Sequence, residues 1–168
     1  MVLRNDPVME FTIREMKMAD MDEVLSIASD PFLTPWTEMM FTREMQLSFS
    51  RSLVALSKVQ QSRQIAGFIT YWIIADEVQL HNIAVHRDFR RRGIASKLFL
   101  AMIQEALDQG IGTGTLEVRN SNEAARKLYE KLGCHVLAVR PSYYSESKED
   151  ALNMSIELKK CPEGFKHV

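Results

Sequence analysis

At 168 residues, with 46% apolar and 26% charged side chains, the chain has the composition of one ordinary globular domain. Its net charge of −1 at pH 7 argues against an overall basic surface for nucleic acid or an anionic membrane. Its two cysteines, Cys134 and Cys161, lack metal-binding or disulfide spacing, and no apolar run reaches the ~20 residues that span a bilayer. With no hydrophobic signal segment, these features predict a cytoplasmic protein without a metal site.

Patterned sequence begins near Met9. We expect residues 1–8 to be a disordered N-terminal extension, residues 9–160 to form one domain and residues 161–168 to be a C-terminal tail. In the first part of the domain, apolar alternation indicates strands and helical spacing of apolar residues indicates helices. The expected strands are residues 9–16, 52–57, 65–74 and 78–85, and the expected helices are residues 19–29 and 37–47. Short polar links between the last three strands predict an antiparallel meander.

The second part of the domain alternates strands with amphipathic helices. Ile94, Leu98, Met102 and Ala106 recur at i+4, which predicts a helix over residues 93–109. The other expected elements are a helix at 120–132 and strands at 115–119, 135–140 and 151–158, the last two flanking a polar Tyr/Ser/Glu/Lys loop. We therefore expect an α+β fold in which a mixed, mostly antiparallel sheet is flanked by about four helices.

The most informative segment is residues 82–95, where a strand ends at Val85, a basic loop follows and a helix begins at Gly93. The first amides of a helix have no internal partners and lie at the positive end of its dipole. Gly93 has no side chain that would block a ligand. Positive charge around this point comes from Arg90, Arg91 and Arg92. Together these features suit a pyrophosphate, although they would equally describe a solvated basic loop before an ordinary helix.

The run Arg90-x-x-Gly93-x-Ala95 resembles the acetyl-CoA pyrophosphate loop of the GNAT superfamily, whose pattern is Gln/Arg-x-x-Gly-x-Gly/Ala. Residues 80–85 are similar to the bulged fourth strand of that family, and residues 116–133 to its next strand and helix. With the Pro35-Trp36-Thr37 segment and Tyr143-Tyr144, the likeness extends from Met9 to Lys159. It is greatest for the bacterial subgroup that acetylates the N-terminal alanine of ribosomal proteins. The resemblance implies a single GNAT domain with a central strand-loop-helix acyl-CoA site and acetyl-CoA as co-substrate.

The resemblance also implies roles for individual residues. Glu117, which would otherwise be a polar residue on a wet sheet face, corresponds to the general base of the subgroup. Tyr129, which would otherwise be a core tyrosine, corresponds to the general acid that protonates the CoA thiolate. A free α-amine has a pKa near ~7.7–8.0, so a base helps the reaction modestly. The cofactor-binding residues implied are Ile83, Ala84, Val85, Arg90, Arg91, Arg92, Gly93, Ile94, Ala95, Ser96, Asn122 and Tyr129.

Three residues depart from the family pattern. His81 stands where an aromatic or apolar residue is more usual, His86 where an acidic residue is frequent, and Cys134 where an aromatic residue commonly follows the glycine. We expect the two histidines to affect the peptide groove. Cys134 has no identifiable partner base and is expected in the core, so we predict direct transfer in a ternary complex.

The acceptor admits three hypotheses. The leading one is the N-terminal α-amine of a protein, above all the N-terminal alanine of a small-subunit ribosomal protein, with Trp36 and Tyr143-Tyr144 flanking an extended peptide and no direct nucleic-acid or membrane partner. The second is a small amine such as a polyamine, an aminoglycoside or an amino acid. It would be attracted by the acidic residues Asp76, Glu77, Glu146, Glu149 and Asp150. The third is a non-catalytic module that binds CoA or a protein, against which the intact Glu117 and Tyr129 argue.

Overall fold

The computed structural model of the chain describes residues 10–29, 35–59, 62–144 and 147–160. The expected N-terminal extension and C-terminal tail lie outside these residues, as does Glu146. Within the described part of the chain, no helix is both long enough and apolar enough to cross a membrane.

The described residues form one seven-stranded sheet with helices on both faces, in the strand order β1-β2-β3-β4-β5-β7-β6. The strands are β1 Phe11–Glu15, β2 Ser50–Val59, β3 Ser62–Ile74, β4 Glu77–Val85, β5 Thr113–Arg119, β6 His135–Tyr144 and β7 Glu149–Glu157. The helices are α1 Met21–Ala28, α2 Glu38–Glu44, α3 Ile94–Asp108 and α4 Glu123–Lys131, with short 3-10 turns η1 Met18–Asp20, η2 Arg87–Phe89 and η3 Leu158–Lys160. Only β4 and β5 pair in parallel, so the predicted mixed, mostly antiparallel α+β fold is confirmed.

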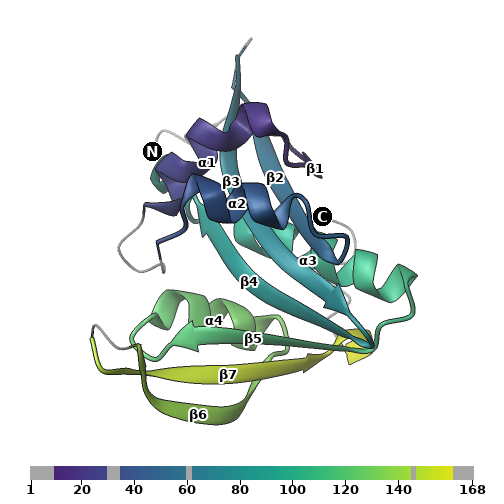
Figure 1. Cartoon of the computed structure of the whole chain (residues 1–168), viewed down its shortest axis with the longest axis vertical. Coiled ribbons are helices and arrows are strands. Elements are labelled where there is room, and N and C mark those ends of the chain that lie inside the picture. Colours follow the sequence, from purple (N-terminus) through teal and green to yellow (C-terminus); the bar gives the residue numbers. More distant parts are fainter. Residues whose placement is uncertain (1–9, 30–34, 60–61, 145–146, 161–168) are drawn as a thin grey trace, which may run out of the picture.

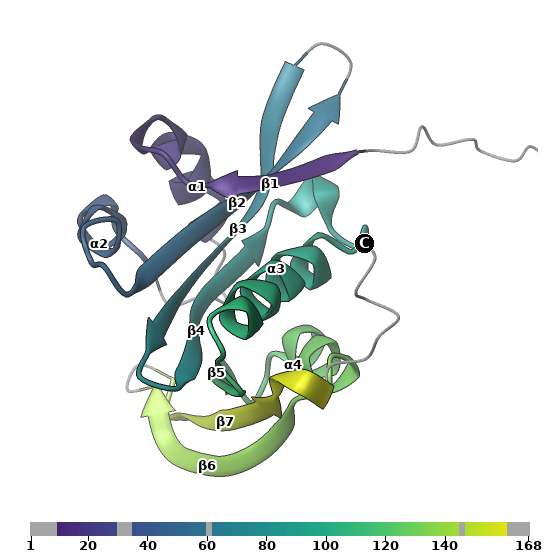
Figure 2. The same ribbon diagram turned by 90° about the vertical axis from the view of Figure 1, so that its right-hand side faces the viewer.

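The two faces of the sheet carry different helices, as Figure 2 shows: α1 and α2 cover one face, and α3 and α4 lie on the other. The predicted i+4 stripe of α3 is fully buried, because Ile94, Leu98, Met102 and Ala106 are each at most 2% exposed. These residues share one core with Tyr129 and Leu132 at the C-terminal end of α4. A second core on the opposite face joins residues of α1 and α2 to β2 and β3.

The sheet opens in its middle, between β4 and β5. The two strands pair only from Glu77↔Thr113 to Leu80↔Leu116, and beyond these residues they diverge (Figure 1). The register of β4 against β3 also shifts at His81, since Tyr71 pairs with Leu80 and Thr70 with Asn82. This bulge and the divergence create a V-shaped gap, and α3 and α4 follow the ends of the two strands that border it.

Several boundaries differ from the predictions for local reasons. Residues 18–20 form a 3-10 turn, so α1 begins at Met21, and α2 ends at Glu44 because the chain turns there toward β2. Within this helix Phe41 is buried, whereas the neighbouring Met40 is exposed. The expected loop containing Tyr143 and Tyr144 is the end of β6, since Tyr144 pairs with Glu149 of β7.

Candidate active site

A cavity of about 670 Å³ follows the gap between β4 and β5. Its lining comes from β4, the loop before α3, the start of α3, β5 and α4, with Trp36 and Tyr144 also contributing. Of the cofactor-binding residues predicted from the sequence, the structure brings to this lining Ile83, Ala84, Val85, Arg90, Arg91, Gly93, Ile94, Ala95, Ser96, Asn122 and Tyr129. Arg92 is exposed and lies outside the lining. Of the three arginines predicted to bind the cofactor, Arg90 and Arg91 therefore line the cavity.

The start of α3 has the geometry of an anion site. Gly93 precedes the helix with φ of 77°, a left-handed conformation that glycine adopts without steric cost. A Cβ atom added at Gly93 would meet no heavy atom within 4 Å, so the space beside it is open. Gly93, the N-cap residue of α3, has no side chain that could cap the helix, and the first amides of α3 lie beside this open space as donors for an anionic ligand.

Two arginines border this open space in different ways. The Nε–H of Arg90 donates a hydrogen bond of 3.2 Å to the carbonyl oxygen of Val85, which ties its guanidinium to the end of β4. Arg91 has φ of 63°, a left-handed conformation that is uncommon for a residue with a side chain. Such conformations persist only where the surrounding structure imposes them, and here the chain must turn from η2 into α3.

The amides of β4 near the cavity are freed by the divergence of the strands. Ile83, Ala84 and Val85 keep their antiparallel partners on β3, whereas pairing with β5 stops at Leu80. Among the strands that the structure describes, none pairs with the gap-facing edge of β4 beyond Leu80. The bulge at His81 lies just before this stretch, where the pairing with β5 stops.

Glu117 projects from β5 on the face away from α3 and α4. Its neighbours Leu116 and Val118 are both 5% exposed and belong to the core beneath α3, so alternation along the strand directs Glu117 to the opposite face. Nη1 of Arg140 lies 2.8 Å from Oε1 of Glu117, and both side chains are partly exposed. Sequence reasoning missed Arg140 because it lies on β6, which reaches β5 only through the intervening β7.

Tyr129 reaches the same cavity from the other face. It is 5% exposed on α4, and its ring packs against Phe99 of α3 with centroids 5.9 Å apart. Burial raises the pKa of the Tyr129 hydroxyl, so the group keeps its proton at neutral pH. The two residues predicted to act as base and acid therefore line one cavity from opposite faces of the sheet.

Asn122 combines a local role with a place in the lining. Its Oδ1 accepts a hydrogen bond of 3.2 Å from the backbone N–H of Ala125, which caps the N-terminus of α4. This cap explains why α4 begins at Glu123 and not at Asn120, where the sequence pattern placed its start.

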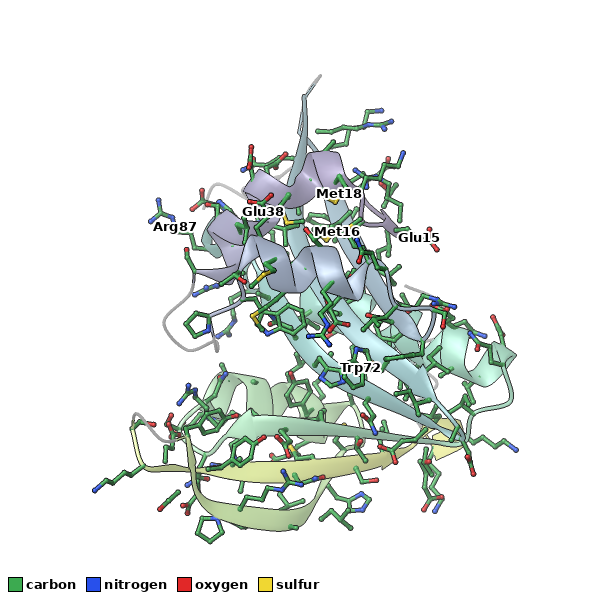
Figure 3. The ribbon with its side chains drawn as sticks, in the orientation of Figure 1. Glu15, Met16, Met18, Glu38, Trp72 and Arg87 are labelled. Carbon is green, nitrogen blue, oxygen red and sulfur yellow. The ribbon has the colours of Figure 1, made fainter. Side chains whose placement is uncertain are left out.

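A cluster of polar and aromatic side chains that the sequence did not reveal lies on the face of the sheet that α1 and α2 cover. Trp72 of β3 donates its Nε1–H to Oε2 of Glu44 at 2.6 Å, and the hydroxyl of Ser50 donates to the same oxygen at 2.6 Å. The Trp72 ring lies between Phe49 and His81, with centroid distances of 5.2 and 4.1 Å. Figure 3 shows Trp72 between α2 and the part of the sheet formed by β5 and β7.

The remaining residues singled out from the sequence divide between core, cavity and surface. Cys134 is buried, as predicted. His86 accepts a hydrogen bond from the N–H of Asp88 at the start of η2 and lies outside the cavity lining, unlike His81. The acidic residues expected to attract a cation also lie outside the lining where they are described: Asp76, Glu77, Glu149 and Asp150. Within the described residues, no group of His, Cys, Asp or Glu side chains could hold a metal ion.

Comparison with known proteins identifies the family of the chain. A family model described as the Acetyltransferase (GNAT) family matches residues 21–134. A protein of Escherichia coli (strain K12) named ribosomal protein bS18-alanine N-acetyltransferase is 32% identical over 152 residues, covering 88% of this chain and 97% of that protein. The crystal structure of the ribosomal-protein-S18-alanine N-acetyltransferase from Escherichia coli superposes with a TM-score of 0.78 and 31% identity, covering 92% of this chain and 97% of that chain. Ard1 from Thermoplasma volcanium gives a TM-score of 0.75 and 30% identity, with coverage of 88% and 97%. This chain therefore belongs to the GNAT family of acetyl-CoA-dependent acetyltransferases.

Proposed function

We propose that the protein transfers the acetyl group of acetyl-CoA to the N-terminal α-amine of a protein, with the N-terminal alanine of a small-subunit ribosomal protein as acceptor. The observation that carries this proposal is the placement of Glu117 and Tyr129 on opposite faces of one cavity. A ternary complex needs such an arrangement, because the amine and the thioester must approach the same point from different sides.

Acetyl-CoA fits the half of the cavity beside α3. The open space at Gly93, the uncapped amides of α3 and the side chains of Arg90 and Arg91 would hold its pyrophosphate. The free edge of β4 at residues 83–85 would hold the pantetheine arm and present an amide to the carbonyl oxygen of the acetyl group. Bound there, acetyl-CoA supplies an activated acetyl group whose leaving group is a thiolate.

Glu117 would accept the proton of the incoming ammonium, directly or through water. Arg140 contacts one carboxylate oxygen, Oε1, and the second oxygen remains for the acceptor. The ion pair is partly exposed and therefore weak, so it orients the carboxylate without preventing an ammonium from binding beside it.

Tyr129 would donate a proton to the departing sulfur. Burial raises the pKa of this hydroxyl, so it stays protonated at neutral pH and can act as a proton donor. A free thiol has a pKa of ~8.5, so the thiolate is a tolerable leaving group at pH 7 and the acid accelerates the reaction without being indispensable.

The acceptor side of the cavity favours a peptide over a small polycation. Glu117 is the one acidic side chain in the cavity lining that the structure describes, so the groove lacks the several carboxylates that would concentrate a polyamine. Aromatic residues border the same lining at Trp36 and Tyr144, and such residues suit contacts with an extended peptide. Modification of a ribosomal protein would take place in the cytoplasm.

Release of CoA thiol from acetyl-CoA, measured with N-terminal peptides and small amines in parallel, tests the proposal. We expect turnover with a peptide that begins with the alanine of the ribosomal protein, and mass spectrometry should place the acetyl group on its α-amine. Turnover with small amines but not with peptides would instead support a small amine as the acceptor. Binding of acetyl-CoA without transfer to any amine would contradict an enzymatic function.

A further inference from the structure

His81 occupies an unusual place at the mouth of the gap. It follows Leu80, the last residue of β4 that pairs with β5, just as Glu117 follows Leu116, the partner of Leu80. Leu80 and Leu116 both face the core beneath α3, and alternation along β5 directs Glu117 to the opposite face. His81 lies at the bulge of β4, and its contact with Trp72, which is hydrogen-bonded to Glu44 of α2, places it on that same opposite face. His81 and Glu117 therefore lie on the two diverging strands and line the same cavity. Both are on the side of the sheet that α1 and α2 cover, which we call the acceptor face.

The imidazole of His81 is held in position by its neighbours. Its ring lies 4.1 Å from the Trp72 ring with an interplanar angle of 43°. Trp72 is fixed in turn by its hydrogen bond to Glu44, whose carboxylate also accepts the hydroxyl of Ser50. A side chain held in this way loses less freedom when it contacts a ligand, and support of this kind is typical of functional residues.

We propose that His81 is a second proton acceptor for the acceptor amine, acting across the mouth of the gap from Glu117. This role rests on the proposed acetyl transfer and adds a catalytic residue to it. One proton leaves the ammonium nitrogen for the unprotonated imidazole nitrogen, and the amine lone pair then forms the new bond to the acetyl carbon. The nitrogen releases its second proton to water as the C–S bond breaks, and the departing CoA thiolate takes a proton from Tyr129, which water replaces. Solvent then removes the proton from the imidazolium.

The charges around His81 are compatible with a neutral imidazole. Partial burial of the ring lowers the pKa of His81 below its ordinary value of 6.5, while the carboxylates of Glu44 on α2 and Glu117 on β5 act in the opposite direction. Arg140 of β6 pairs with Glu117 and offsets part of its charge, and Trp72 of β3 is neutral. At pH 7 the imidazole is therefore largely unprotonated and able to accept a proton.

The ordinary pKa of an imidazole lies closer to neutral pH than that of a carboxylate. Proton transfer is most effective when the pKa of the base lies near the working pH. Ordinary pKa values are ~6.5 for histidine and ~4.3 for glutamate, against ~7.7–8.0 for the α-amine. Removing His81 should therefore reduce transfer most below the pKa of the amine, where the substrate arrives protonated, and least above it.

Chemical rescue of His81→Ala tests the inference. At pH 7 we expect kcat/KM for the alanine-terminal peptide to fall roughly 10²-fold, at the low end of the effect of a general base because Glu117 remains. Added imidazole should restore part of the rate in this variant, and substituted imidazoles should do so in order of their pKa. His135→Ala, at an exposed position on β6, is the matched control and should neither lose activity nor respond to imidazole.

Each outcome decides between roles. An unchanged rate and pH profile in His81→Ala would overturn the role of His81 and leave the proposed acetyl transfer intact. A loss that imidazole does not restore, with the wild-type pH profile retained, would also overturn it and assign His81 to packing beside Trp72. Failure of the wild-type protein to acetylate any peptide while it binds acetyl-CoA would contradict the proposed function, and the inference with it.

Discussion

The two faces of the gap between β4 and β5 are built in different ways. On the side of α3 and α4, the cavity lining comes from segments that lie close together in the chain, between Ile83 and Tyr129, and Tyr129 also belongs to the buried core on that side. The face below α1 and α2 combines segments far apart in the chain, since Glu44, Trp72, Glu117 and Arg140 come from four elements. The cofactor face is thus formed by neighbouring segments of the chain, whereas the acceptor face is an assembly of exposed and half-buried side chains from separate elements.

This difference suggests that the two faces serve different requirements. A cofactor common to a whole family can be held by backbone amides, a glycine and a helix terminus, which depend little on distant residues. An acceptor that varies between enzymes is better recognised by side chains on separate elements, which can change without altering the fold. Mutations on the two faces should therefore affect acetyl-CoA and peptide separately.

The largest effect is expected for Gly93→Glu, which should abolish the binding of acetyl-CoA as measured by calorimetry. The new carboxylate would enter the open space beside α3 and repel the pyrophosphate, and the residue would be strained at a φ of 77°. Gly110→Glu is the matched control, because Gly110 has a φ of 80° and equally open surroundings but lies at the far end of α3. Unchanged affinity in folded Gly93→Glu would exclude this loop as the site.

Glu117→Gln should lower turnover by roughly 10²–10⁴ below the pKa of the amine and leave acetyl-CoA affinity unchanged. The loss should diminish as the pH rises past that pKa, because a free amine then needs no base. Glu157→Gln removes a carboxylate from a comparable surface ion pair, with Lys160, and should change neither quantity. A wild-type pH–rate profile in Glu117→Gln would make Glu117 a structural residue.

Tyr129→Phe should reduce kcat by less than Glu117→Gln, with the protein still folded and acetyl-CoA affinity nearly unchanged. The ring that packs against Phe99 is retained, and only the hydroxyl is lost. Tyr71→Phe is an informative control, because this fully buried hydroxyl donates to Glu105 and its loss should cost stability of about 1–2 kcal/mol without changing kcat. Thermal unfolding measured beside kinetics separates the two effects. Activity that falls only in step with unfolding would make Tyr129 a core residue.

The same contrast explains what the sequence could and could not predict. The stripe of α3 and the loop at Gly93 follow local rules of periodicity and helix termini, and both lie where those rules place them. The roles assigned to Glu117 and Tyr129 came from family resemblance, and the structure adds that one cavity contains both residues.

The acceptor face was largely beyond prediction. Whether Trp72 would contact Glu44 and His81 depends on how α2 packs on the sheet, which no local pattern records. Arg140 lies within reach of Glu117 because the strand order β5-β7-β6 places β6 on the far side of β7 from β5, and a strand order of this kind is not visible in the sequence. The extent of β6 was missed at Tyr144 because its polar, tyrosine-rich end looks like a loop, although β7 provides a partner there.

The smallest expected effect concerns the support of the acceptor face, through Glu44→Gln. The Glu44 carboxylate accepts from both Trp72 and Ser50, and a neutral amide oxygen can replace it only with weaker hydrogen bonds. Losing part of a charge-assisted bond costs about 1 kcal/mol, which corresponds to about a fivefold change in an equilibrium constant. Because Trp72 packs against His81 on the acceptor face, that change should appear as a several-fold higher KM for the peptide, with KM for acetyl-CoA unchanged. Glu38→Gln, in the exposed first turn of the same helix, should change neither constant (Figure 3 labels this residue). An equal rise in both KM values would show that the two faces are coupled, and the contrast between a local cofactor face and an assembled acceptor face would no longer hold.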